Sequence, residues 1–188
     1  MLLFHEGKLK LIYSIPQDSF YESLFDCKHI WASGKNGLYQ IEPETYKVIS
    51  HFNSANSPLP DAYIYNIKKN NSIIWLGTSK GLFKFDILSG KWTNWLSEHG
   101  LINNLIYTLK LKENLLFIGT SQGMSIFNIK AEKFTSFTAS NSQLLSNWIF
   151  GISHWKDSKY LVSTDGGVYS FNLNNRLFKY LGITNGNA

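Results

Sequence analysis

Histidine, cysteine and aspartate are the residues of this chain that could hold a metal ion or transfer protons. The five histidines are scattered, and no two of them lie within four residues of each other. Cys27 and His29 form a short-range pair of metal-binding types, but the chain offers no further ligands near them at the spacing of a zinc site. We therefore interpret the pair as turn or core residues, and we predict neither a metal centre nor a cofactor.

No group of residues is arranged for acid–base or nucleophilic catalysis. Asp61, Asp86 and Asp165 fall in turns or at the ends of predicted strands, and no second carboxylate is placed to pair with them. Asp86 is expected to accept hydrogen bonds from turn amides. The serines lie in no Gly-x-Ser-x-Gly elbow. The segment 78–81 resembles a loose phosphate loop, but the helix that such a loop needs does not follow it. The sequence thus predicts no catalytic residue.

The elements that must position these residues are indicated by a unit that recurs four times. Its clearest copy is Ile74-Trp75-Leu76-Gly77-Thr78-Ser79-Lys80-Gly81-Leu82-Phe83, and related copies cover 30–39, 116–125 and 160–169. The last glycines stand at positions 37, 81, 123 and 167, so the copies follow one another at intervals of 42 to 44 residues. A fixed period in this range indicates one supersecondary unit that is copied and stacked.

Each unit contains four strand-like segments. In the second unit, strand-forming residues at 62–67, 73–77, 82–86 and 91–95 are separated by short polar or glycine-containing turns. No segment shows the 3.6-residue spacing of a helix. Four antiparallel strands in about 43 residues predict the blade of a β-propeller, in which stacking buries both faces of a blade. The chain is therefore predicted to be one all-β segment, 1–188. Its complete blades are expected at 19–52, 61–95, 103–137 and 146–180.

The repeat pattern begins and ends inside a blade. Residues 1–14 align with the third and fourth strands, which predicts a half blade, and 182–188 resemble the linker that opens a new blade. Propellers close by pairing their first and last blades, whereas an open arc exposes apolar blade faces. We expect either self-association of two chains or completion of the ring by further blades of a parent chain.

Composition narrows the classes of partner. Apolar residues make up 44% and aromatic residues 15% of the 188 residues, which suits a folded domain. The net charge is +5, but the lysines are scattered and Arg176 is the only arginine, so we expect no nucleic-acid partner. No apolar window is long enough for a membrane helix, so this segment is not expected to contact a membrane. Residues 1–7 lack the basic start and the long apolar run of a signal peptide.

A binding face is the remaining candidate for function. In a propeller, the linker between blades shares one face with the turn between the second and third strands. The ligand-binding residues predicted around this mouth of the channel are Tyr63, Lys80, Asn103, Asn104, Gln122, Asn147, Trp148 and Asp165, with Lys35 nearby. Amides and acids pair with hydroxyl groups and an aromatic face covers a sugar ring, so the set suits carbohydrate. The alternative is that the asparagines cap turns and Trp148 packs between blades. Trp155 is expected on the opposite face, as a contact for another chain.

The aligned units resemble a known repeat. Their shared pattern is Asn-x-Ile, a variable turn, Ile-Trp-Leu-Gly-Thr-x-x-Gly-Leu-x-x-Phe-Asp, and Gly-Lys-Trp/Phe-x-x-Trp/Phe, with the Gly-Thr pair altered at Ser33-Gly34 and Ser163-Thr164. This pattern is similar to the two-component regulator propeller repeat, which builds the periplasmic sensor region of hybrid two-component systems in Bacteroidetes-type bacteria. The resemblance implies a periplasmic sensor propeller that detects products of polysaccharide breakdown. The kinase and DNA-binding parts of such systems have no counterpart in this sequence.

Functions from different classes remain open at this point. The first is a non-catalytic sensor segment that binds an oligosaccharide. The second is a protein-interaction or assembly segment without a small ligand of its own. A propeller lyase or hydrolase is a third alternative. Propellers serve all of these functions, so the fold alone does not choose between them.

Overall fold

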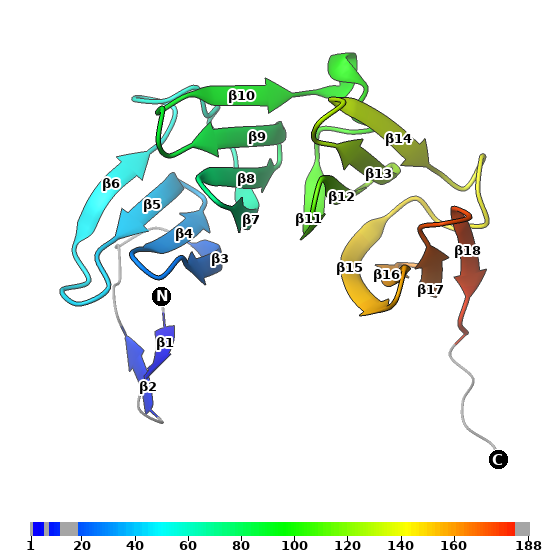
Figure 1. Cartoon of the computed structure of the whole chain (residues 1–188), viewed down its shortest axis with the longest axis horizontal. Helices are drawn as coiled ribbons and strands as arrows, with labels where there is room; N and C mark the ends of the chain where they lie inside the picture. Colours follow the sequence, from blue (N-terminus) through cyan, green and yellow to red (C-terminus); the bar gives the residue numbers. More distant parts are fainter. Residues whose placement is uncertain (1, 6–7, 12–18, 183–188) are drawn as a thin grey trace.

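Strands make up nearly all the regular structure of the protein. The computed structural model describes residues 2–5, 8–11 and 19–182. These residues form four antiparallel sheets of four strands and one sheet of two strands. The four larger sheets follow one another around an open arc (Figure 1). The prediction of an all-β propeller segment with four whole blades is confirmed.

Each blade is a meander in which strands that follow in sequence also lie side by side. Blade 1 contains β3 (Phe20–Phe25), β4 (Ile30–Gly34), β5 (Gly37–Ile41) and β6 (Val48–Phe52). Blade 2 contains β7 (Ile64–Asn70), β8 (Ile73–Thr78), β9 (Gly81–Asp86) and β10 (Trp92–Trp95). Blade 3 contains β11 (Ile106–Lys112), β12 (Leu115–Thr120), β13 (Gly123–Asn128) and β14 (Lys133–Phe137). Blade 4 contains β15 (Ile149–Lys156), β16 (Lys159–Thr164), β17 (Gly167–Asn172) and β18 (Leu177–Tyr180).

Short segments accompany the blades. One turn of 3₁₀ helix, η1 (Ser97–His99), lies between blades 2 and 3. β1 (Leu2–His5) and β2 (Lys8–Leu11) pair as a separate antiparallel hairpin within the predicted half blade. The remaining residues of that half blade, and the predicted linker from 183 onwards, lie outside the described residues.

The first strand of each blade lies on the concave side of the arc, and the fourth strand lies on its convex side (Figure 1). Each of these inner strands, β3, β7, β11 and β15, is one of the two edge strands of its sheet. An edge strand has backbone groups that face away from its sheet and need partners from elsewhere. The concave side of the arc is therefore built from four neighbouring sheet edges.

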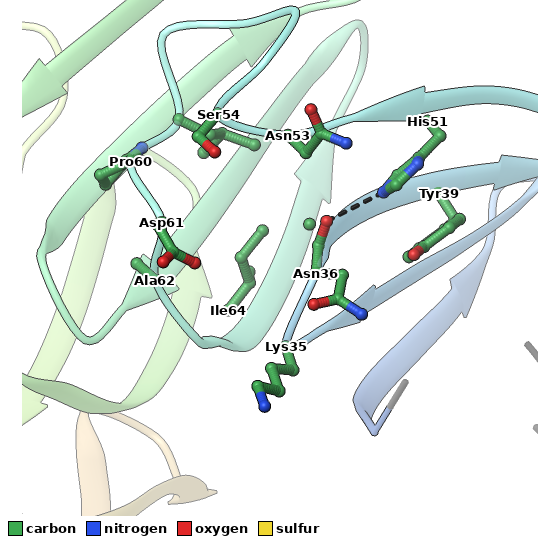
Figure 2. A pocket seen from close by; sticks show the side chains of 12 residues that line it. Lys35, Asn36, Tyr39, His51, Asn53, Ser54, Pro60, Asp61, Ala62 and Ile64 are labelled. Atoms are coloured by element: carbon green, nitrogen blue, oxygen red, sulfur yellow. Dashed lines mark hydrogen bonds between the residues drawn. The ribbon is translucent and has the colours of Figure 1, made fainter. Parts of the chain in front are cut away.

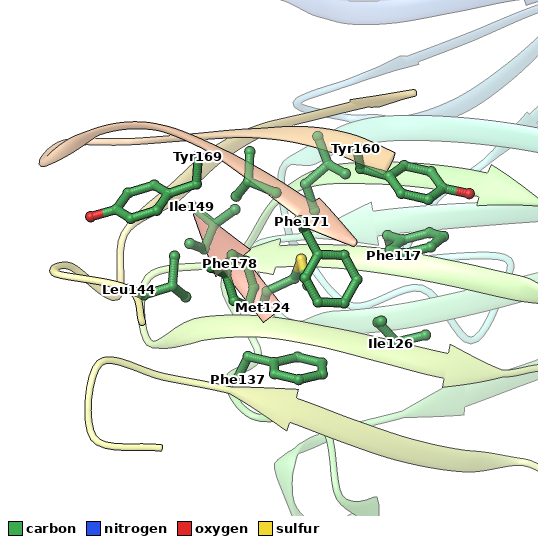
Figure 3. Close-up of a cluster of buried hydrophobic side chains, with 12 residues drawn as sticks. Phe117, Met124, Ile126, Phe137, Leu144, Ile149, Tyr160, Tyr169, Phe171 and Phe178 are labelled. Atoms are coloured by element: carbon green, nitrogen blue, oxygen red, sulfur yellow. The ribbon is translucent and has the colours of Figure 1, made fainter. Parts of the chain in front are cut away.

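The blades pack face to face through three seams of buried side chains. Successive residues of a strand point to opposite faces, so Ile74 of β8 packs towards blade 1 while Trp75 packs towards blade 3. Trp75 is 2% exposed, and its ring centroid lies 5.6 Å from that of Trp95 and 5.9 Å from that of Phe127. The seam between blades 3 and 4 is built in the same way, from apolar and aromatic side chains of both blades (Figure 3).

The repeated Gly-Thr-x-x-Gly frame shapes the turn between the second and third strands. In blade 2, Thr78 Oγ1 donates to the carbonyl of Gly81 and accepts the N–H of Lys80, both at 2.9 Å. Thr120 and Thr164 do the same in blades 3 and 4. Gly81 has φ of +125°, a conformation that glycine adopts without strain. The frame is thus a structural device of the turn.

The first glycine of the frame lets the next blade approach. A Cβ atom on Gly119 would lie 2.8 Å from the carbonyl oxygen of Ile149 and 2.5 Å from Cγ2 of Thr108. Because only a hydrogen occupies that position, the inner strand β15 packs directly on the backbone of β12. The glycine therefore helps to fix where the inner strand of the following blade lies.

Asp86 stabilises the turn between the third and fourth strands, as expected from the sequence. Its Oδ1 accepts the N–H of Leu88 at 3.1 Å, and its Oδ2 accepts the hydroxyl of Ser89 at 2.8 Å. These bonds, foremost that from Ser89, hold the pKa of the Asp86 carboxyl below its ordinary value. Asn128 and Asn172 accept backbone N–H groups at the equivalent corners of blades 3 and 4.

Candidate binding face

Every inner strand interrupts its pairing at the same place. The pairing of β7 with β8 passes from Ile64 directly to Asn66 and leaves out the residue between them. The corresponding residue is also left out in β3, β11 and β15. Such a β-bulge frees one residue from the ladder and re-aims its side chain. The four bulge residues are all aromatic: Tyr21, Tyr65, Tyr107 and Phe150.

The bulge residues and two aromatic residues that precede inner strands form contacts across the blades. We call the six side chains the inner-strand aromatics. Their first group, from blades 1 and 2, has ring centroids 5.1 to 6.1 Å apart and contains Tyr21, Tyr63 and Tyr65. Their second group, from blades 3 and 4, has centroids 5.6 to 6.1 Å apart and contains Tyr107, Trp148 and Phe150.

Exposure distinguishes the inner-strand aromatics from the aromatic residues of the seams. Tyr21 is 44% exposed, Tyr63 40%, Trp148 47% and Phe150 46%. Tyr65 and Tyr107 are half-buried. Aromatic side chains are usually covered when a fold can cover them, and an exposed cluster of them marks a site for a partner or ligand.

The two groups also influence each other electrostatically. Burial raises the pKa of the Tyr65 hydroxyl, and the neighbouring Tyr21, Tyr63 and Tyr107 raise it further. Tyr107 belongs to the second group, so the influence crosses the boundary between blades 2 and 3.

Side chains that follow the bulges tie neighbouring inner strands together. Oε2 of Glu22 accepts the backbone N–H of Ile67 in the next blade at 2.7 Å. In the same way, Oδ1 of the buried Asn66 accepts the N–H of Leu109 at 3.2 Å, and its Nδ2 donates to the carbonyl of Tyr107 at 2.8 Å. These bonds satisfy backbone groups of the sheet edges and fix the spacing between successive bulges.

The linker and the turn between the second and third strands share a face, as expected. The N–H of Ser79 donates to the carbonyl of Tyr63 at 2.9 Å, and the N–H of Tyr63 donates to Oγ of Ser79 at 3.1 Å. Among the predicted ligand-binding residues, Tyr63 and Trp148 belong to the inner-strand aromatics. Lys80, Gln122 and Asp165, together with Lys35, are exposed at the turns.

The three predicted asparagines use their side-chain oxygens within the fold. Oδ1 of Asn103 accepts the N–H of Leu105 at 2.8 Å and the hydroxyl of Ser121 at 3.2 Å. Oδ1 of Asn104 accepts the N–H of Ser97, and Oδ1 of Asn147 accepts the N–H of Ala139. The alternative stated from the sequence, that they cap turns, describes these bonds. Their role in ligand binding stays a prediction.

Trp155 lies at the far end of β15 from Trp148. Seven residues separate the two along the chain, which corresponds to about 23 Å in an extended strand. Trp155 is 46% exposed, and the ammonium of Lys156 lies 4.7 Å from its ring centroid. Trp148 and Trp155 therefore form a matched pair, equally exposed but on opposite sides of the blade.

A cleft of about 400 Å³ lies between blade 1 and the linker to blade 2 (Figure 2). The ring of His51 stacks on Tyr39 with centroids 4.0 Å apart, and its Nε2 is 2.9 Å from the carbonyl oxygen of Asn36. Lys35 and Asp61 also line the cleft. Ala62 and Ile64, which flank Tyr63 in the sequence, line it as well.

Within the part of the chain that the structure describes, no three His, Cys, Asp or Glu side chains are grouped to hold a metal ion. In that same part, no helix has the length and apolar character to cross a lipid bilayer.

Tyr21, Tyr65, Tyr107 and Phe150 are absent from the binding residues predicted from the sequence, because each lies in a segment with the composition of an ordinary strand. The available signal was their recurrence at equivalent positions of the four units, because aromatic residues at 21, 65, 107 and 150 keep the period of the repeat.

Comparison with solved structures supports the fold. The extracellular domain of a protein described as a one component system from B. thetaiotaomicron matches with a TM-score of 0.76 and 21% identity, over 91% of this chain and 23% of that chain. The extracellular domain of a protein described as a hybrid two component system from the same bacterium matches with a TM-score of 0.73 and 16% identity, over 87% of this chain and 24% of that chain. Sqt1 from Saccharomyces cerevisiae matches with a TM-score of 0.72 and 14% identity, over 95% of this chain and 53% of that chain.

The chain thus spans about a quarter of the two bacterial domains and about half of the yeast protein. At these identities the likeness concerns the fold. No protein-family model matches the sequence, and no curated protein matches it.

Proposed function

We propose that the protein is a non-catalytic, ligand-binding segment of a sensor propeller, and that its ligand is an oligosaccharide. The observation that carries the proposal is the set of six inner-strand aromatics, four of them at least 40% exposed. Aromatic faces cover the apolar faces of sugar rings, and tyrosine hydroxyls supply hydrogen bonds. Lys80, Gln122 and Asp165, exposed at the turns, add polar groups that suit sugar hydroxyls. The extracellular domains of similar fold favour a sensor role in the periplasm.

A thermal-shift screen with a broad panel of oligosaccharides tests the proposal. A ligand that binds the native state raises the melting temperature with its concentration. We expect at least one oligosaccharide to do so with the wild type. Trp148→Ala should lose most of the shift, whereas Trp155→Ala, which removes an equally exposed indole from the other end of β15, should keep it. A panel without any shift, or equal losses in both variants, would contradict the proposal.

The non-catalytic part of the proposal has its own test. Prolonged incubation with the oligosaccharides that bind should leave them unchanged in chromatography. Release of shorter products, or of unsaturated products, would favour the propeller hydrolase or lyase alternative.

A second function, assembly through a blade face, is favoured by one observation. Each blade has one face that points towards the next blade along the chain. On that face lie Trp31 in blade 1, Trp75 in blade 2 and Phe117 in blade 3, all at most 2% exposed. Leu161 holds the equivalent position in blade 4, where it is only half-buried. We propose that a second copy of the chain covers this face. Sedimentation equilibrium should then give a dimer that Leu161→Lys weakens, and a clean monomer would refute it.

A further inference from the structure

The inner-strand aromatics form one row across four blades. Each group spans a blade boundary, because the first draws on blades 1 and 2 and the second on blades 3 and 4. The boundary between blades 2 and 3 is held by Asn66, whose side chain bonds to the backbone of Tyr107 and Leu109. The inner strands β7 and β11, which carry Tyr65 and Tyr107, pack against each other. The row therefore continues from Tyr21 to Phe150.

The repeat of the bulge indicates what the row could hold. A single pocket would need a bulge in one or two blades, whereas all four inner strands carry one. Each of these bulges presents an aromatic ring at an equivalent position along its inner strand. A ligand that uses the row must itself repeat a flat, partly apolar unit, as a chain of sugar rings does.

The charge of the row narrows the ligand further. None of the six side chains carries a charge at neutral pH, and the charged groups that the proposed function assigns to the turns, Lys80 and Asp165, are opposite in sign, so the row itself offers no ionic partner to a sulfate or a uronic acid. Ring faces and hydroxyl groups are matched by neutral sugars.

Building on the proposed function, we propose that one neutral, linear oligosaccharide lies across the blades and contacts both aromatic groups at once. The site then responds to the length of the chain. A short oligosaccharide reaches one group, and a longer one reaches both. The second contact is intramolecular once the first has formed, so it adds affinity at little further entropic cost.

Calorimetric titration of the whole chain tests this inference. The probes are neutral linear series from disaccharide to heptasaccharide: cello-, xylo-, manno- and malto-oligosaccharides. In the series that binds, we expect the heptasaccharide to bind at least about tenfold more tightly than the trisaccharide. Tyr63→Ala in the first group and Trp148→Ala in the second should each reduce the affinity of the heptasaccharide to near that of the trisaccharide. Trp155→Ala should change neither.

The outcomes separate this inference from the proposed function. If no probe binds at any length, the proposed function falls and the inference falls with it. If binding occurs but the affinity is the same for trisaccharide and heptasaccharide, only the inference is overturned. It is also overturned if one of the two variants leaves the affinity of the heptasaccharide unchanged, since the ligand would then use one group. The side chains of Tyr63 and Trp148 are exposed, and a melting curve without ligand verifies that each variant is folded.

Discussion

Trp75 of blade 2 and Trp148, which precedes the inner strand of blade 4, are the same type of residue, yet their surroundings are opposite. Trp75 is 2% exposed and lies in the seam between blades 2 and 3, against Trp95 and Phe127. Trp148 is 47% exposed and lies on the concave side, against Tyr107 and Phe150. The seam aromatics hold one blade to the next, while the inner-strand aromatics contact one another and leave much of their surface open. Trp75 belongs to a strand that is buried on both faces, whereas Trp148 lies just before the inner strand β15 and contacts Phe150, the residue that the first bulge of β15 leaves out of the ladder.

The largest expected effect is the loss of stability when an aromatic side chain of a seam is removed. Trp75→Ala should lower the free energy of unfolding by about 3–5 kcal/mol, since it removes a large buried side chain and leaves a cavity. Trp148→Ala should lower it by less than about 1 kcal/mol, since the indole is half exposed. Urea denaturation followed by circular dichroism measures both. Similar losses in the two variants would show that the inner-strand aromatics are structural as well.

A smaller effect tests how closely the blades approach. Gly119→Ala should destabilise the protein by about 1–3 kcal/mol, because the added Cβ meets backbone of β15 and a side chain of β11. Gly166→Ala is the matched control, since its Cβ would have no neighbour closer than 3.5 Å. We expect the control to change stability by no more than about 0.5 kcal/mol in denaturant titrations. Equal tolerance at both glycines would contradict the observed packing of β15 on β12.

The smallest expected effect is the pH dependence of the stability that Asp26 contributes. Partial burial works to raise the pKa of Asp26, but hydrogen bonds from His29 and Lys28 backbone amides and the Trp31 indole outweigh it and hold the pKa below its ordinary value. The unfolded chain therefore binds this proton more readily. The stabilisation is present above about pH 4 and is lost as the pH falls through the folded pKa.

Asp26→Asn tests this assignment. The variant should be less stable than the wild type at neutral pH, and the difference should shrink in acid. Chemical denaturation at neutral and at acidic pH measures the free energy of unfolding of both proteins. A difference between them that does not depend on pH would show that the charge of Asp26 does not contribute to stability.

Much of the fold could be predicted from the sequence because the pattern of one blade occurs four times. The spacing of Gly37, Gly81, Gly123 and Gly167 indicates the blade period, and runs such as 73–77 indicate strands buried on both faces. The capping role of Asp86 also follows from its residue type and position, since a carboxylate after a strand commonly accepts turn amides.

The site could be predicted only in part. The order of strands in a blade determines where linkers lie, and on that ground Tyr63 and Trp148 could be proposed for the binding face; their role in ligand binding stays a prediction. Tyr65 and Tyr107 look like ordinary strand residues in the sequence, and only the pairing register reveals that they are bulged. For Asn103, residue type could not decide the role, since the same amide oxygen caps a turn or binds a hydroxyl.

The inner-strand aromatics are the ligand-binding surface that we propose. A crystal structure of the chain with a bound oligosaccharide, chosen from those that raise the melting temperature, tests it most directly. We predict sugar rings stacked on Tyr63 or Tyr65 and on Trp148 or Phe150, on the concave side of the arc. An oligosaccharide bound elsewhere, in the cleft lined by Lys35 and Asp61 or beside Trp155, with the inner-strand aromatics uncovered, would contradict the claim.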